Sequence, residues 1–117
     1  MLVGAKHDEM TFGQNGSVYT TATSDAIKPP TDRVFVVIQF LEDTTFDSSG
    51  GLVAETATKF INTEDAAGDL DAGSETGDEG SGGKQITNAV IFPKGFAITG
   101  RWTEIDLNSG SIIAYIG

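Results

Sequence analysis

The sequence predicts an all-β protein: a single-domain β-sandwich or small barrel of about six to seven antiparallel strands with a long acidic, glycine-rich loop. Three observations lead to this fold class. β-Branched and aromatic residues are concentrated in short segments, glycine, proline and asparagine separate these segments, and no segment shows a convincing helical period. The length of 117 residues corresponds to one domain, residues 1–117.

The first part of the chain is predicted to hold an arm, a strand and a connection. Residues 1–11 lack periodicity, which is typical of an N-terminal arm. Asn15-Gly16 is a strong hairpin signal because both residue types tolerate positive φ, and residues 18–23 then have the composition of a strand. Pro29-Pro30 cannot continue a β-ladder, so residues 25–32 are predicted to be a connection.

The strongest predicted strand covers residues 33–41. Both of its faces are apolar, which is typical of a central strand covered on both sides. Residues 42–51 are expected to form a polar loop with one aromatic residue, Phe46, inside it. Residues 52–61 alternate weakly, and their threonines favour a strand over the alternative, a short helix at 53–60.

Residues 62–83 differ in character from the rest of the chain. They contain seven acidic residues, no basic residue and a single leucine, so they have little apolar surface to bury. We therefore expect a long acidic, glycine-rich loop here. Either it packs on its own domain, or neighbouring molecules hold it in an assembly.

The last third of the chain is predicted to hold further strands. Residues 85–92 read as a strand, and residues 92–95 fit a type I turn with proline second and glycine fourth. In the strand that follows, Trp102 falls on the buried face. Ile105 is out of phase with it, which predicts a β-bulge near Thr103–Glu104.

The final predicted strand covers residues 112–116, after a loop of asparagine, serine and glycine. No polar tail follows this strand. We therefore expect it to lie in the core, and we expect the chain to be a complete β module.

The charge and composition restrict the partners. A net charge of −10 at pH 7, with seven basic residues against seventeen acidic ones, argues against nucleic acids and anionic membranes. The chain has no cysteine for a disulfide or a thiolate metal site. Its N-terminal segment is too short and too polar to be a signal peptide. We expect a soluble protein made in a cytoplasm, with another protein or a cation as its partner.

No catalytic constellation is visible in the residues. His7 is the single histidine, and it lies near the N-terminus without an evident partner to orient it. Adjacent acidic residues point to opposite faces of a strand or into solvent, and do not form the convergent pair of a glycosidase. The sequence therefore predicts a protein that is not an enzyme and uses no cofactor.

The acidic loop contains aspartates, which are also the residues that bind calcium in many proteins. Asp65, Asp69 and Asp71 offer carboxylates, the ligands that calcium prefers. Counted from Asp69, however, the fifth and twelfth positions of an EF-hand loop are Gly73 and Gly80, where ligands are required. We predict a solvated acidic loop and no metal site.

Two regions of the chain, one in the middle and one near the end, carry a resemblance to known proteins. Their stretches are Phe40-Leu41-Glu42-Asp43-Thr44-Thr45-Phe46-Asp47, and then Ile91-Phe92-Pro93-Lys94-Gly95, Gly100-Arg101-Trp102-Thr103-Glu104-Ile105 and Ser109-Gly110-Ser111-Ile112-Ile113-Ala114-Tyr115. Both regions resemble small, mostly uncharacterised proteins of marine tailed bacteriophages, which end in a similar run of Pro-x-Gly, Gly-Arg-Trp/Phe and Ile-Ala-Tyr-Ile/Leu-Gly. The resemblance covers roughly residues 33–117, and the acidic loop is the part least alike.

The resemblance implies a structural protein of the virion, with head decoration, or cement, as the expected role. Such a protein is made in the cytoplasm of the bacterial host and binds the major capsid protein on the outer capsid surface, often as a trimer. A strongly acidic chain suits this outward position, because inside the head it would face DNA of the same sign. The alternative is a tail, adaptor or fibre-associated module that binds host surface glycans. That role requires an exposed tryptophan or tyrosine.

Apolar residues outside the clear core strands are the candidates for contact with a capsid protein, together with an arginine of a type enriched at interfaces. An N-terminal arm among them is expected to add a strand to a capsid sheet. The candidate contact residues are Leu2, Val3, Met10, Phe12, Phe46 and Arg101.

Overall fold

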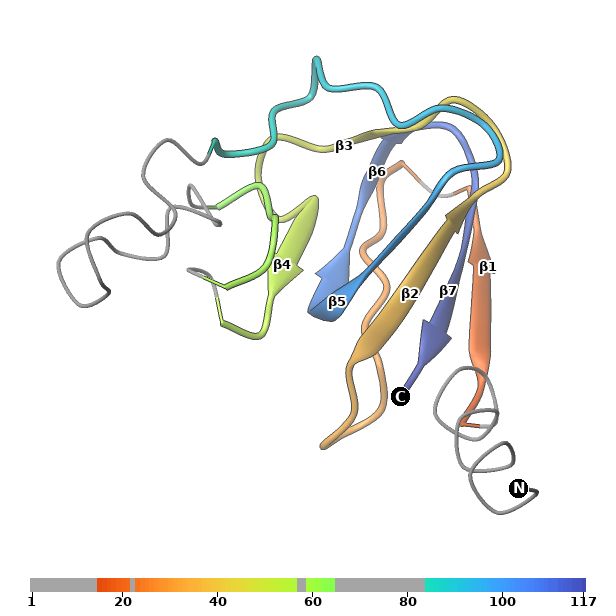
Figure 1. The fold of residues 1–117 in the computed structure, drawn as a ribbon, viewed down its shortest axis with the longest axis vertical. Coiled ribbons are helices and arrows are strands. Elements are labelled where there is room, and N and C mark those ends of the chain that lie inside the picture. Colours follow the sequence, from red (N-terminus) through yellow and green to blue (C-terminus); the bar gives the residue numbers. More distant parts are fainter. Residues whose placement is uncertain (1–14, 22, 57–58, 65–83) are drawn as a thin grey trace, which may run out of the picture.

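A computed structural model describes residues 15–21, 23–56, 59–64 and 84–117. In these residues the chain forms seven strands in two antiparallel sheets and no helix, which confirms the predicted all-β fold class (Figure 1). No segment of this described part is a helix long and apolar enough to cross a membrane. The strands are β1 (Ser17–Thr20), β2 (Phe35–Phe40), β3 (Thr45–Phe46), β4 (Leu52–Ala54), β5 (Ala97–Ile105), β6 (Leu107–Ser109) and β7 (Ile112–Ile116).

The larger sheet has the strand order β1-β7-β2-β5-β4, and all its neighbouring strands are antiparallel. The apolar segment predicted as the central strand is β2, the third of the five. The predicted last strand is β7, which lies between β1 and β2 (Figure 1). β3 and β6 form a separate two-stranded sheet, and buried side chains from both sheets meet in one core.

β2 departs from the expected alternation at its start. Phe35, Ile38 and Phe40 are all buried, although Phe35 and Ile38 are an odd number of residues apart. The register with both neighbouring strands shifts between Phe35 and Val37, and this irregularity keeps Phe35 on the core side. On the other face Val37 is half-buried and Gln39 is exposed. The expectation that both faces of this strand are covered is therefore wrong.

β5 contains the predicted bulge. Glu104 lies opposite Val53 and Trp102 lies opposite Ala54, so Thr103 is an additional residue on β5. Because of this extra residue, both Trp102 and Ile105 face the core despite their odd spacing. A bulge near Thr103–Glu104 is thus confirmed.

Residues 84–96 do not form a strand, contrary to the prediction for 85–92. Ile86 and Phe92 are buried, but residues 87–91 between them are exposed and include a turn in which the Val90 amide bonds to the Thr87 carbonyl (3.1 Å). Only Phe92 pairs as an extended residue, with Thr44. Composition suggested a strand here, but the segment lies at the surface between two buried side chains, Ile86 and Phe92.

The polar loop predicted at 42–51 contains β3, and Phe46 belongs to the core. Its side chain is 0% exposed, so it is not a surface contact and its place in the candidate contact set is corrected. β3 pairs with β6, and Phe46 lies opposite Leu107. This partner is distant in the sequence, so local composition did not indicate the pairing.

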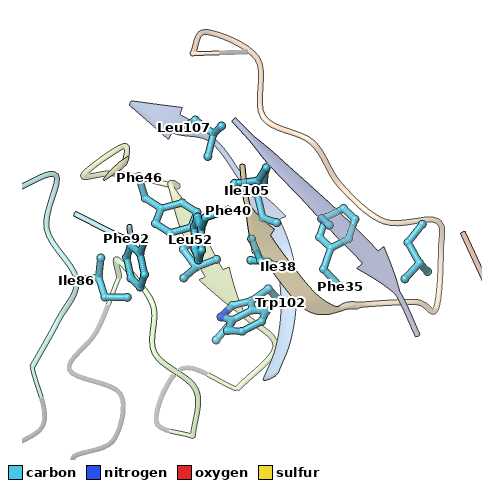
Figure 2. Close-up of a cluster of buried hydrophobic side chains, with 14 residues drawn as sticks. Phe35, Ile38, Phe40, Phe46, Leu52, Ile86, Phe92, Trp102, Ile105 and Leu107 are labelled. Atoms are coloured by element: carbon cyan, nitrogen blue, oxygen red, sulfur yellow. The ribbon is translucent and has the colours of Figure 1, made fainter. Parts of the chain in front are cut away.

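Three phenylalanine rings form the centre of one end of the core (Figure 2). Phe92 stacks on Phe40 with ring centroids 4.9 Å apart. Phe46 meets both rings edge-on, at 5.9 Å from Phe40 and 5.3 Å from Phe92. Such edge and offset contacts add roughly 0.5–1.5 kcal/mol per pair to the free energy of burial. The three rings thus tie the segments around β2, β3 and the 84–96 region together.

Trp102 also belongs to the core and is 0% exposed, as predicted. Its indole Nε1 donates to the carbonyl of Ile61 at 2.8 Å, so the buried N–H is satisfied. The ring lies against Gly100, where an added Cβ would stand 2.8 Å from ring atoms. Glycine at position 100 therefore makes room for the tryptophan.

Candidate protein-interaction surface

Exposed large apolar side chains are concentrated just before β5. In the described ranges the exposed large apolar side chains are Tyr19, Ile61, Val90, Ile91 and Phe96. Three of them lie within residues 90–96, which we call the apolar turn: Val90 is 39% exposed, Ile91 63% and Phe96 51%. In Figure 1 this segment runs beside the residues that follow β2, at the end of the sheet opposite the C-terminus.

Backbone hydrogen bonds hold the apolar turn against the segment that follows β2. Thr44 and Phe92 bond to each other through both amides, at 2.9 and 2.8 Å. The Gly95 amide donates to the Phe40 carbonyl at 2.8 Å, and the Phe40 amide donates to the Phe96 carbonyl at 2.9 Å. The position of the turn is therefore defined by these backbone hydrogen bonds together with the burial of the Phe92 ring.

The chain reverses direction at residues 93–96. The Phe96 amide bonds to the Pro93 carbonyl at 3.1 Å, and Gly95 has a φ of 86°. Positive φ at the third residue of four is the requirement of a type II turn. The predicted type I turn at 92–95 is thus wrong in type and displaced by one residue. The Lys94 amide also donates to the Asp43 carboxylate at 2.9 Å, which fixes the tip.

The outward orientation of Ile91 follows from the burial of Phe92. Successive side chains of an extended segment point to opposite sides, and the Phe92 ring is stacked on Phe40 in the core. Ile91 therefore faces solvent. Phe96 also remains exposed where the chain enters β5. The result is a rigid backbone that presents two large apolar side chains to solvent, as protein-binding surfaces do.

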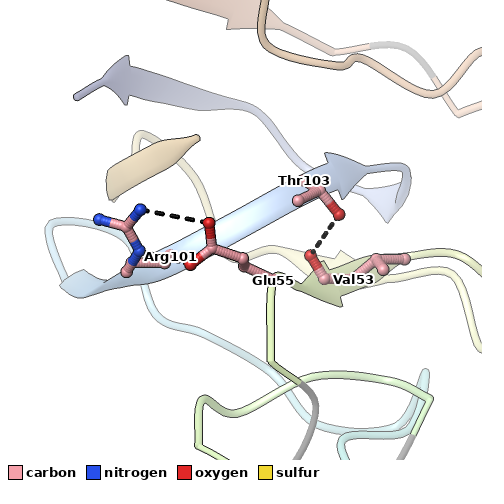
Figure 3. Close-up of polar contacts among 4 residues, drawn as sticks. All are labelled: Val53, Glu55, Arg101 and Thr103. Atoms are coloured by element: carbon pink, nitrogen blue, oxygen red, sulfur yellow. Dashed lines mark hydrogen bonds and ion pairs between the residues drawn. The ribbon is translucent and has the colours of Figure 1, made fainter. Parts of the chain in front are cut away.

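Arg101 is exposed and forms an ion pair with Glu55 on the adjacent chain segment (Figure 3). Its guanidinium donates to both carboxylate oxygens, at 2.6 and 3.2 Å. The hydrogen bond from Arg101 lowers the pKa of Glu55, and the same bond raises the pKa of Arg101. Glu104, three residues further along β5, pairs with Lys28, and 3.6 Å separate the Lys28 Nζ from a Glu104 carboxylate oxygen.

Asp106 is an acid in an unfavourable position. One oxygen of its carboxylate is buried without a hydrogen-bond partner in the described part of the chain. Burial raises the pKa of Asp106, and the negative charges of Asp47, Glu104 and Asp25 raise it further. These acids do not form a metal site: the described residues contain no group of three or more histidine, cysteine or acidic side chains that could hold an ion.

The remaining candidates from the sequence fall in other places. Leu2, Val3, Met10 and Phe12 lie outside the described residues, as does the proposed arm. His7 and the aspartates considered for calcium, Asp65, Asp69 and Asp71, lie outside them as well.

Sequence reasoning missed Ile91 and Phe96. A signal for Ile91 was present, because two large apolar residues, Ile91 and Phe92, stand side by side directly before a proline. In extended backbone, only one of such a pair can face the core. For Phe96 the sequence held no such signal, since its alternation with Ile98 and Trp102 indicated burial.

Comparison of the chain with protein-family models, curated proteins and solved structures gives no match.

Proposed function

We propose that this chain is a non-enzymatic structural protein of a tailed-bacteriophage virion. In this role it is a head decoration protein that binds the outer surface of the major capsid protein lattice and stabilises the shell. The apolar turn is the part that contacts the capsid protein.

The observation that carries this proposal is the pair of exposed side chains on a fixed turn. Ile91 and Phe96 are 63% and 51% exposed, on a backbone bonded to Phe40 and Thr44. A rigid apolar anchor loses little conformational entropy on binding, so most of its burial energy contributes to affinity. The resemblance to marine phage proteins rests in part on this same stretch, Ile91-Phe92-Pro93-Lys94-Gly95.

The charge supports an outward-facing position. A protein of net charge −10 on the outer surface avoids the packaged DNA, which carries charge of the same sign. Stabilisation of the shell then follows from mass action. A protein that binds the assembled lattice and not the free subunits raises the stability of the lattice, by about 2.7 kcal/mol per site at a concentration of 100 Kd.

Binding to heads tests the proposal. Expanded heads of the phage that encodes the chain, prepared without the protein, are mixed with wild-type protein and sedimented. We expect saturable binding with a copy number that approaches that of the major capsid protein, and no binding to unassembled capsid protein. Quantitative mass spectrometry of native particles gives the same ratio independently. Absence from the particle, or only tens of copies, contradicts a role in coating the shell.

Variants test the apolar turn itself. Ile91→Ser combined with Phe96→Ser removes both exposed anchors, and we expect binding to heads to weaken by at least about 100-fold. Ile61→Ser is the matched control, because Ile61 is also an exposed isoleucine but lies outside the turn. Equal binding by the double variant and the wild type contradicts the proposal that the apolar turn contacts the capsid protein. Another surface of the chain would then have to bind the heads.

A further inference from the structure

In the part of the chain that the structure describes, the face of the larger sheet that points away from the core carries exposed or half-buried side chains on four strands. Pairing across β1, β7, β2 and β5 places side chains in rows, and the row Val18, Ala114, Ile38 and Ile98 faces the core. The rows on either side of it lie on the opposite face, which we call the outer sheet face. These rows are Ser17, Tyr115, Val37 and Thr99, and Tyr19, Ile113, Gln39 and Ala97.

All eight residues of the outer sheet face are uncharged. Tyr19 is 64% exposed, while Val37, Ile113 and Tyr115 are half-buried and form an apolar centre. Further along β5, Arg101 is paired with Glu55, so it adds no uncompensated charge. A neutral and partly apolar sheet face is unusual on a chain of net charge −10.

The charge distribution indicates which partner fits this face. A partner with a basic surface is attracted to the acidic parts of the molecule and gains nothing from a neutral one. Two copies of this chain repel each other over most of their surfaces, because each carries a net charge of −10. The outer sheet face lets two copies meet without opposing carboxylates.

The size of the side chains differs between the two sides of this face. Figure 1 shows β5, β2, β7 and β1 side by side in that order. The large, exposed side chain of Tyr19 lies on β1 at one side of the face, and the small side chains Ala97 and Thr99 lie on β5 at the other. A twofold axis parallel to the strands, midway between β7 and β2, places β1 of one copy over β5 of the other. Each Tyr19 then fills the space above the small residues of the partner.

We propose that two copies of this chain associate through their outer sheet faces about such a twofold axis, with the strands aligned as in a β-sandwich. The interface is small. Four strands spaced about 4.8 Å apart, over about four residues of 3.3 Å each, give roughly 250 Å² per copy. Stable interfaces bury about 800 Å² per partner, so we expect weak association, with a dissociation constant between about 100 µM and 1 mM.

Sedimentation of the isolated full chain tests this pairing without any capsid. Between about 10 µM and 1 mM we expect a reversible shift from monomer to dimer, and stronger association at high salt, because salt screens the repulsion between acidic copies. A chain that stays monomeric over this range overturns the proposal. A trimer, the state that the resemblance implies, overturns it as well, because a twofold face cannot close a trimer.

Thr99→Glu is the decisive variant, because Thr99 is exposed and the change puts a carboxylate on the face of each copy. We expect dimer formation to weaken by at least about tenfold, with an unchanged circular dichroism spectrum. Thr31→Glu is the matched control: it adds the same charge in an exposed turn of the β1–β2 connection and is expected to dimerise like the wild type. Equal dimerisation by Thr99→Glu and Thr31→Glu overturns the proposal.

The inference is independent of the proposed function. The apolar-turn variant, Ile91→Ser with Phe96→Ser, is expected to dimerise like the wild type even if it no longer binds heads. If Thr99→Glu instead loses binding to heads while the wild-type chain is monomeric at 1 mM, the outer sheet face contacts the capsid protein, and the twofold pairing is wrong.

Discussion

The amide of Ile86 donates a hydrogen bond of 2.9 Å to the carbonyl of Asn62. This bond joins the two parts of the chain that flank residues 65–83. Neighbouring contacts strengthen this closure. The Gln85 side chain donates to the carbonyl of Thr63, and the Thr63 hydroxyl accepts the Leu52 amide of β4 at 3.0 Å. Asn62 and Thr63 are fully buried. The domain is therefore held together on both sides of residues 65–83 by groups that do not belong to that segment.

Removal of residues 65–83 is expected to leave the fold intact. Replacement of the segment by three glycines keeps the Asn62–Ile86 closure and shortens the loop, which lowers the entropy cost of closing it by about 1 kcal/mol. Six of the seventeen acidic residues and no basic residue are lost, so the net charge changes from −10 to −4. We expect a melting temperature equal to or above that of the wild type. A shortened chain that fails to fold shows that residues 65–83 contribute to the core.

Replacement of Asp106 by asparagine is expected to stabilise the protein at neutral pH. The folded state raises the pKa of Asp106, so the folded protein binds a proton more readily than the unfolded chain. The charged form therefore costs stability at neutral pH, and this cost disappears as the pH falls through the folded pKa. Because the carboxyl is only partly buried, we expect a gain of up to about 1 kcal/mol.

Denaturant unfolding between pH 4 and pH 8 measures this effect, with Glu55→Gln as the control of opposite sign. The folded state lowers the pKa of Glu55, so its contribution is present at neutral pH and is lost as the pH falls through that lowered pKa. The free energy of unfolding of Asp106→Asn should exceed that of the wild type most at neutral pH, whereas that of Glu55→Gln should be slightly below the wild-type value there. A stability gain for Asp106→Asn that does not change with pH contradicts the explanation that the gain comes from removing the charge of this carboxyl.

Replacement of Gly95 by alanine is expected to destabilise the protein by about 1–2 kcal/mol. The cause is the backbone: φ is 86°, while an added Cβ at this position meets no atom within 4 Å. Asparagine tolerates this conformation better than alanine does, so Gly95→Asn should lose less stability than Gly95→Ala. Lys94→Ala, one residue away at ordinary φ, should stay within about 0.5 kcal/mol of the wild type. Equal unfolding midpoints for Gly95→Ala and Lys94→Ala are incompatible with the type II turn.

The features that sequence predicted well are those set by local alternation. The central position of β2, the last strand and the bulge near Thr103 all follow from which neighbouring residues are apolar. Phe46 was misplaced because its burial depends on β6, which lies far along the chain and brings Leu107 opposite it. The prediction of a strand at 85–92 was wrong for a related reason. The apolar residues of this region bury separately at Ile86 and Phe92, and Ile91 between them remains exposed.

Trp102 packs directly against Gly100, and both residues are expected to be important for stability. Trp102→Phe retains an aromatic ring but loses the hydrogen bond to Ile61, which should cost about 1 kcal/mol, whereas Trp102→Ala should cost about 3–5 kcal/mol through the cavity it leaves.

Gly100→Ala should also destabilise the protein, because its Cβ would stand 2.8 Å from the indole ring. The phenylalanine ring lacks the outer part of the indole, and the atoms nearest the added Cβ, Cη2 and Cζ2, belong to that part. The two changes should therefore couple: Gly100→Ala is expected to cost at least about 1 kcal/mol less in the Trp102→Phe background than in the wild type. Chemical denaturation of the four proteins in this cycle measures the coupling. Additive costs would show that the alanine is accommodated by the backbone of β5, and that the glycine is not required by the tryptophan.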